Sequence, residues 1–336
     1  HDLAGALGAP RILLTRSKRD ISGPTNASRF WLRLETMAGG LIEPPLRYDL
    51  LARALDAGKG LPNRASRPEP VPAADLRPKK ISVTDVDRLA ADPYAFYAKT
   101  ILKLSRLDPV DAEPGPAWKG TLIHAVLDSW AKQDRYAPAH LVERMRHALD
   151  GAGVHPVVRT LWLPCLIEAS EWIEQQVAER QAKGRTPLAS EISGEATCDG
   201  ILLHGRADRI DRTDTGLGIV DYKTGKAPKD RQVAEGFALQ LGLLAFIAEQ
   251  GGFDGVQGDA DAFEYWSFQR EGGKPGKISS PAGNSGNKIP PDIFVETMVI
   301  KFKEAAAKWL SGREPFTAKL NPDYARSDYD HLMRLE

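Results

Sequence analysis

Apolar residues recur every three or four positions between residues 85 and 183, which is the spacing of helices that bury one face. The predicted helices cover 85–91, 94–102, 118–133, 141–149 and 160–183. The period changes to two over 191–198, 201–211 and 217–222, which predicts an antiparallel meander. A helix over 233–250, a strand over 262–269, a loop over 270–291 and a helix over 293–310 follow. The pattern predicts an α/β domain.

An N-terminal region and a linker are predicted before this domain. Residues 1–61 contain an apolar strand over 11–15 and an amphipathic stretch over 30–37. Residues 62–80 hold several prolines and are predicted to form an extended linker. The compact domain is expected over 81–336, with Thr84 capping its first helix.

Composition narrows the class of protein. A hydrophobic content of 42% supports a core, and 45 basic residues balance 45 acidic ones, so any nucleic-acid contact must come from local patches. There is no apolar run of membrane-spanning length and no secretory signal, so we expect a cytoplasmic protein without membrane contact. Cys165 and Cys198 are too few for a disulfide scaffold or a zinc site.

The segment from His204 to Gly225 carries the strongest chemical signal. If its turn centres near residues 214–215, Asp208 lies opposite Asp221 on the neighbouring strand. Opposed carboxylates repel each other, and a divalent cation with oxygen ligands removes that penalty. Lys223 shares the face of Asp221 because strand side chains alternate. Two carboxylates and one ammonium on one face indicate a metal-dependent phosphodiester hydrolase.

A simpler interpretation is available for the same residues. An Asp-x-Lys pair on a surface is usually a solvated ion pair that contributes little. Ile219 and Val220 favour a buried strand, however, so Asp221 is expected at the end of a core strand. A charge in that position needs a partner or a metal.

Four motifs in order resemble the RecB family of nucleases within the PD-(D/E)XK superfamily. They are G-T-L-I-H-A-V-L-D-S-W from Gly120, G-R-A-D-R-I-D from Gly205, I-V-D-Y-K-T-G from Ile219 and Q-L-G-L-L-A-F from Gln240. The resemblance implies a restriction-endonuclease-like core, in which a mixed sheet with an antiparallel meander is flanked by helices.

The chain also resembles the C-terminal part of the AddB family, subunits of bacterial helicase–nucleases that resect double-strand breaks for recombinational repair. The matching stretches are L-T-R-S-K-R from Leu14, S-R-F-W-L-R-L from Ser28, I-S-V-T-D-V-D-R-L-A-A-D-P-Y-A-F-Y-A from Ile81 and D-Y-D-H-L from Asp328. Residues 1–61 would then be the tail of a helicase-like domain, and the partners would be DNA, as single strands or duplex ends, and an AddA-type subunit. Because there is no phosphate-binding P-loop, we expect no ATP hydrolysis by this chain alone.

The resemblance implies roles for individual residues. His124, Asp208, Asp221 and the carbonyl of Tyr222 would hold Mg²⁺, with Mn²⁺ as a substitute. Lys223 would orient the attacking water or stabilise developing charge, and the products would carry 5′-phosphate and 3′-hydroxyl ends. Gln240 would hold the strand backbone or the water.

Other assignments stay open at this level. Asp128, one turn after His124, is a candidate to orient the imidazole, and Glu191 or Glu195 is a candidate for an outer carboxylate. Three basic residues after the catalytic strand are candidates for phosphate contacts, although a solvated surface explains them equally well. They are Lys226, Lys229 and Arg231.

The chain departs from both families in two places. Leu244 stands where the Q-x-x-x-Y motif has tyrosine. The four cysteines that ligate an iron–sulfur cluster in many AddB relatives are missing, so no cluster is expected. Residues 315–336 are instead predicted to pack against 84–102 through side chains.

Two alternative functions remain at this level. One is a stand-alone RecB-like exonuclease or endonuclease, against which the helicase-like start of the chain argues. The other is a DNA-binding scaffold without nuclease activity, against which the intact His124, Asp208, Asp221 and Lys223 argue.

Overall fold

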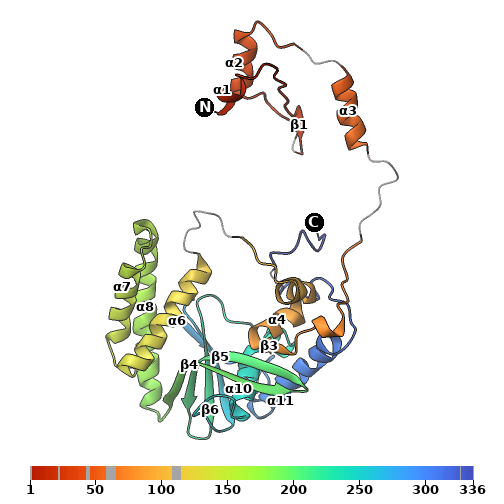
Figure 1. Cartoon of the computed structure of the whole chain (residues 1–336). Helices are drawn as coiled ribbons and strands as arrows, with labels where there is room; N and C mark the ends of the chain where they lie inside the picture. The colour runs from red at the N-terminus through yellow and green to blue at the C-terminus, as the bar shows by residue number, and fades with distance from the viewer. Residues whose placement is uncertain are drawn as a thin grey trace. The chain divides into compact units, whose positions relative to one another are not determined.

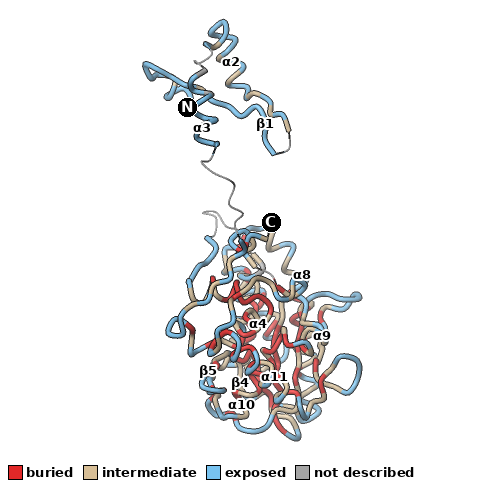
Figure 2. The backbone as a smooth tube through the Cα atoms, turned by 90° about the vertical axis from the view of Figure 1, so that its right-hand side faces the viewer, coloured by how far each residue is buried: buried red, intermediate tan, exposed pale blue. Residues whose placement is uncertain are grey.

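The computed structural model describes residues 2–21, 23–42, 46–57, 66–107, 115–325 and 327–335. The chain divides into two compact units, His1–Ser66 and Arg67–Glu336 (Figure 1). Buried residues are concentrated in the second unit (Figure 2). Nowhere in the described residues is there a helix long and apolar enough to cross a membrane.

The first unit is built from short elements. They are α1 (Asp2–Ala6), the paired strands β1 (Arg19–Asp20) and β2 (Gly23–Pro24), α2 (Arg29–Met37) and α3 (Leu46–Asp56). Ser28 caps α2 by accepting a hydrogen bond from the Trp31 N–H at 3.2 Å. The amphipathic stretch over 30–37 is thus helical, but no residue of α2 is buried. The strand predicted over 11–15 is wrong, because these residues are irregular.

The second unit is organised around one mixed sheet. Its strands are β3 (Lys80–Ser82), β4 (Thr186–Cys198), β5 (Ile201–Arg212), β6 (Leu217–Lys223), β7 (Ala260–Ser267) and β8 (Lys277–Ser279). The predicted antiparallel meander is β4-β5-β6, and parallel β3 and β7 with antiparallel β8 complete the sheet. The expected α/β core with a mixed central sheet is therefore confirmed.

Strand β5 lies at a fork in this sheet. One edge of β5 pairs with β4 along its whole length. The other edge pairs with β3 at 202–204 and with β6 at 209–212, so residues 205–208 lie between the two partner strands. A Cβ on Gly205 would lie 2.8 Å from Leu244 and 2.9 Å from Val83, so glycine permits the close approach of α10 and α4 here. Asp208 therefore lies at the fork.

Two hydrophobic cores cover the opposite faces of the sheet. Ile219 belongs to the core formed with α4 (Val83–Ala91), α10 (Gln240–Glu249) and α11 (Pro291–Ala305), which continues as a π-helical turn over Ala306–Leu310. The next residue, Val220, belongs to the core formed with α6 (Pro116–Asp134), α7 (His140–Gly151) and α8 (Pro156–Gln181). These helices form a separate layer, seen beside the sheet in Figure 1.

Several helices and one loop have other bounds than the sequence predicts. Helix α4 begins two residues earlier than expected, because Ser82 and not Thr84 caps it by accepting from the Asp85 N–H at 3.0 Å. The helix predicted over 94–102 is α5 (Pro93–Phe96) followed by a π-helical turn over Tyr97–Ile101. The helix predicted over 233–250 is broken into α9 (Asp230–Ala234) and α10, with Gly236 at φ +89° between them. The loop predicted over 270–291 contains β8.

The C-terminal tail packs where the sequence predicts. Phe316 stacks on Phe96 with ring centroids 6.2 Å apart, and the Tyr94 N–H donates to the Thr317 carbonyl at 3.0 Å. Further along, Met333 is fully buried among residues of the α5 region. The predicted packing of the tail against 84–102 is therefore confirmed.

This packing predicts a loss of stability when the tail's anchor is truncated. Phe316 is fully buried, so Phe316→Ala should lower the free energy of unfolding by about 3 kcal/mol through lost burial and a residual cavity. Urea unfolding followed by circular dichroism measures the change. Leu320→Ala is the control, because Leu320 is 50% exposed in the same tail and should change little. Equal stabilities of the two variants would contradict the anchoring of the tail by Phe316.

Candidate metal centre

Three carboxylates lie in a row across adjacent strands. They are Glu191 on β4, Asp208 on β5 and Asp221 on β6. Ser190 on β4, Arg209 on β5 and Val220 on β6 pair side by side across the sheet. The three carboxylates form the neighbouring row, which is the next residue on β4 and β6 and the preceding residue on the antiparallel β5. The register that the sequence predicts for Asp208 and Asp221 is therefore the one the strands adopt.

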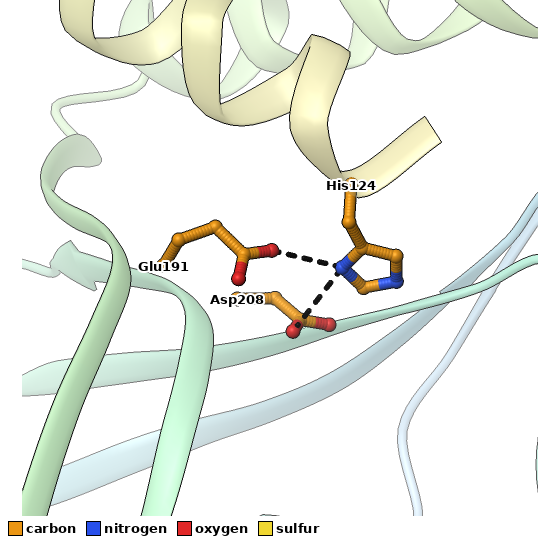
Figure 3. Close-up of side chains that lie close together, drawn as sticks. All are labelled: His124, Glu191 and Asp208. Carbon is orange, nitrogen blue, oxygen red and sulfur yellow. Dashed lines mark hydrogen bonds and ion pairs between the residues drawn. The ribbon is translucent and has the colours of Figure 1, made fainter. Parts of the chain in front are cut away.

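Helix α6 places His124 over two of these carboxylates (Figure 3). The His124 Nδ1 lies 2.9 Å from Glu191 Oε1 and 3.4 Å from Asp208 Oδ1. The ligand atoms of His124, Glu191 and Asp208 all lie within 4.8 Å of one another. One cation with bonds of about 2.0–2.5 Å fits among atoms at that separation. Carboxylate oxygens with one imidazole suit a hard or borderline divalent ion.

Asp221 lies beside this group in the most buried position. Its side chain is 2% exposed, and its Oδ2 lies 2.7 Å from the Lys223 Nζ. Burial raises the pKa of Asp221 to about 6, the Lys223 ammonium opposes this shift, and the negative charge of Asp208 adds to it. Asp221 therefore carries an incompletely compensated charge near neutral pH, which a bound cation would stabilise.

The same carboxylates hold the cationic side chains in their charged forms. Burial lowers the pKa of His124, but hydrogen bonds to Asp208 and Glu191 outweigh it and raise that pKa to about 10. Burial likewise opposes the charged form of Lys223, while Asp221 and Asp208 raise its pKa overall. A metal bound to His124 would have to displace the proton that the imidazole carries here.

Two further hydrogen bonds fix the side chains of Asp208 on β5 and Lys223 on β6. The Tyr222 N–H donates to Asp208 Oδ2 at 2.7 Å. The N–H and C=O of a strand residue point to the same edge, so the Tyr222 carbonyl faces the same side as Asp208. Gln240 at the start of α10 accepts a hydrogen bond from the Lys223 Nζ at 3.0 Å. Gln240 therefore contacts the lysine itself, where the sequence predicts contact with the backbone or a water.

The structure distinguishes the other candidates around His124. Glu191 lies at the site, whereas Glu195 pairs with Lys80 at 2.8 Å on the exposed surface. Asp128, a candidate to orient the imidazole, pairs with Lys132 at 2.9 Å, and the imidazole Nδ1 contacts Glu191 and Asp208. Their i, i+4 spacing on α6 brings Asp128 and Lys132 together.

The basic residues after β6 differ in their surroundings. Lys226 and Lys229 are exposed on the segment between β6 and α9. Arg231 forms an ion pair with Glu235 at 2.7 Å on α9. Their predicted contacts with phosphates remain predictions.

Asp87 of α4 is a fourth acidic residue near this site. Its Oδ1 accepts a hydrogen bond from the Leu239 N–H at 2.6 Å, at the start of α10. Burial raises the pKa of Asp87 to about 7 and the charge of Asp221 adds to this, while the Leu239 hydrogen bond and the Lys223 charge lower it. Sequence reasoning missed Asp87, because an acid inside a short amphipathic helix gives no signal of its partners.

The raised pKa of Asp87 predicts a pH-dependent effect on stability. The folded protein binds this proton up to about pH 7, whereas an unfolded aspartate releases it near pH 4, at roughly 3.9. Wild-type stability should therefore fall as pH rises through this window. Asp87→Asn keeps an oxygen for the Leu239 N–H and removes the titration. Between pH 4.5 and pH 8, its free energy of unfolding should therefore rise by about 2 to 4 kcal/mol relative to that of wild type.

Urea unfolding with EDTA present measures this difference at both pH values. The exposed Asp254→Asn serves as control and should follow the wild-type profile. If the free energies of unfolding of Asp87→Asn and wild type changed in parallel with pH, the raised pKa of Asp87 would be contradicted.

Known proteins were compared with the chain in sequence and in structure. A family model described as the PD-(D/E)XK nuclease superfamily matches residues 80–322. The uncharacterized protein RT0391 of Rickettsia typhi is 31% identical over 192 residues, covering 53% of this chain and 22% of that protein. The uncharacterized protein RC0550 of Rickettsia conorii is 29% identical over 191 residues, covering 52% and 23%. The chain thus spans less than a quarter of the length of these relatives.

Among solved structures, the crystal structure of SSO0001 matches 77% of this chain and 84% of its own, with a TM-score of 0.24 and 12% identity. That TM-score is too low to support an argument. The family model, in contrast, covers the whole sheet and the residues from His124 to Gln240. The chain belongs to the PD-(D/E)XK nuclease superfamily.

Proposed function

We propose that this chain is a divalent-metal-dependent deoxyribonuclease of exonuclease type that hydrolyses phosphodiester bonds. The observation that carries this proposal is the cluster of His124, Glu191 and Asp208 at the fork of the sheet, beside the buried ion pair of Asp221 and Lys223. Membership of a nuclease superfamily supports the reaction class. DNA as the substrate rests on the resemblance to RecB-type nucleases.

The residues present fit a metal ion. His124, Asp208 and Glu191 already bring their ligand atoms together, and the buried Asp221 adds a carboxylate that lacks full compensation. We assign Mg²⁺, with Mn²⁺ as a substitute, because oxygen ligands dominate the site. A bound ion of this kind would supply Lewis acidity toward phosphate and a water of lowered pKa.

Lys223 is the group that this chain contributes to charge stabilisation. Asp221 on one side and Gln240 on the other hold its ammonium, and the carboxylates keep it protonated. A fixed ammonium stabilises charge that develops on a phosphate during attack, with little reorganisation. Lys223 also offers donor hydrogens that orient a water, and hydrolysis would leave a 5′-phosphate and a 3′-hydroxyl.

We further propose that the chain is the nuclease module of an AddB-type subunit working with an AddA-type partner in recombinational repair. The motifs shared with the AddB family support this proposal. The first unit fits the tail of a larger domain, since no residue of α2 is buried within it.

The test is a cleavage assay on linear and circular DNA, single- and double-stranded, with Mg²⁺ and with EDTA. Asp208→Ala, Asp221→Ala and Lys223→Ala should each lower the rate at least about a hundredfold, because each removes a ligand or a charge that acts in the transition state. Glu195→Ala is the matched control, because it removes an exposed carboxylate from the strand that carries Glu191.

Circular dichroism confirms that each variant is folded before it is assayed. A folded Asp221→Ala protein with near-normal Mg²⁺-dependent cleavage would show that the site is assigned wrongly. Cleavage of linear DNA only would support the exonuclease type, and cleavage of circles would favour an endonuclease.

A further inference from the structure

A cavity of about 370 Å³ lies between α4, the π-helical turn after α5 and the C-terminal tail. Most of its charged lining is basic. The charged residues are Arg88, Lys99, Lys103, Arg106 and Asp328. Four cations with one carboxylate give a local positive charge in a chain whose formal net charge is zero.

The cations of this basic cavity are only partly neutralised. Arg106 lies 3.6 Å from Asp328, but the two side chains are 73% and 63% exposed, so solvent screens this pair. Arg88 forms an ion pair with Asp85 on its own helix. Within the described part of the chain, Lys99 and Lys103 have no ion-pair partner. The cavity therefore presents at least two ammonium groups to a ligand.

The backbone around Lys103 is held in a conformation that side chains rarely adopt. Lys103 has φ +58°, directly after the π-helical turn, and such conformations persist only where the surroundings enforce them. The Leu104 N–H donates to the Ala98 carbonyl at 3.0 Å, and the Tyr329 hydroxyl donates to the Leu104 carbonyl at 2.7 Å. The docked tail thus fixes the segment that carries Lys103.

Helix α4 connects this cavity with the metal centre. Asp87 interacts electrostatically with Asp221 and Lys223, and the next residue, Arg88, lines the basic cavity. Both sites therefore lie against α4.

The metal centre cannot by itself attract its substrate strongly. Glu191, Asp208 and Asp221 repel a phosphodiester when no cation is bound, and Lys223 is already engaged by Asp221 and Gln240. Contacts with phosphates generally fix the register of a protein on nucleic acid without reading its sequence. With a cation bound at the centre, a separate cationic site adds contacts that hold the strand.

We infer that the basic cavity binds backbone phosphates of the nucleic-acid strand whose neighbouring phosphodiester bond reaches the metal centre. This inference rests on the proposed function, which makes nucleic acid the substrate. Lys99 and Lys103 are the principal contacts, with Arg88 and Arg106 adding positive charge. Because phosphates are common to all sequences, the site holds the strand without base preference.

The test measures binding of a fluorescent single-stranded oligonucleotide by anisotropy, in EDTA, over a series of salt concentrations. Lys99→Gln with Lys103→Gly removes two charges, and glycine tolerates the positive φ. The double variant should bind roughly tenfold more weakly, and the slope of log K against log salt should become shallower by about 1.4, since each lost contact contributes about 0.7. Lys99→Gln with Arg106→Gln is a second variant that leaves residue 103 unchanged.

The matched control is Arg146→Ala with Lys183→Ala, which removes two exposed charges from α7 and from the turn that follows α8. This control should keep the wild-type salt slope. Equal effects of the control and the cavity variants would overturn the inference. So would a cavity that binds inorganic phosphate in calorimetry while oligonucleotide binding is unchanged by both double variants.

The binding assay needs no cleavage, so the two proposals fail separately. Binding that depends on Lys99 and Lys103 in a protein that never cleaves DNA would support the cavity and contradict the proposed function. In an active protein, the cavity variants should raise KM and leave kcat near wild type, and a loss confined to kcat would contradict the inference.

Discussion

Carboxylates gathered at the middle of a sheet repel one another, and the arrangement around β5 compensates that repulsion. Asp208 and Asp221 lie on neighbouring strands with Glu191 next to them, where like charges destabilise the sheet. The fork between β3 and β6 keeps this part of β5 open, so helices can deliver compensating groups. His124 comes from α6, and Gln240 from α10 holds Lys223 against Asp221.

On the face of these strands that α6 covers, a buried cationic network lies beside His124. Arg209 is 1% exposed, donates to the Tyr222 hydroxyl at 2.7 Å and lies 4.2 Å above the Trp266 ring. Asp211 pairs with both Arg209 and Arg185. Removing one partner from such a buried pair usually costs more than the pair itself contributes. This network fixes Tyr222, whose N–H in turn holds Asp208, so the geometry of the site depends on these neighbouring contacts.

The sequence was sufficient for the parts of the site that depend on local pairing. The turn between β5 and β6 is short, so its centre sets the register that places Asp208 opposite Asp221. The alternation of side chains then puts Lys223 beside Asp221. Asp87 and the choice of Glu191 over Glu195 depend on how distant segments pack, which local patterns do not encode. The break between α9 and α10 was missed for a related reason, since Gly236 is one residue inside an otherwise helical pattern.

Asp208, Asp221 and His124 are proposed to hold one divalent cation together. Crystals soaked in Mn²⁺, with anomalous diffraction recorded at the manganese edge, test this proposal most directly. One strong peak is expected between Asp208 and Asp221, at about 2.0–2.6 Å from their oxygens and within ligand distance of the imidazole. A fully ordered site without a peak there, or with His124 turned away from both carboxylates, would contradict it.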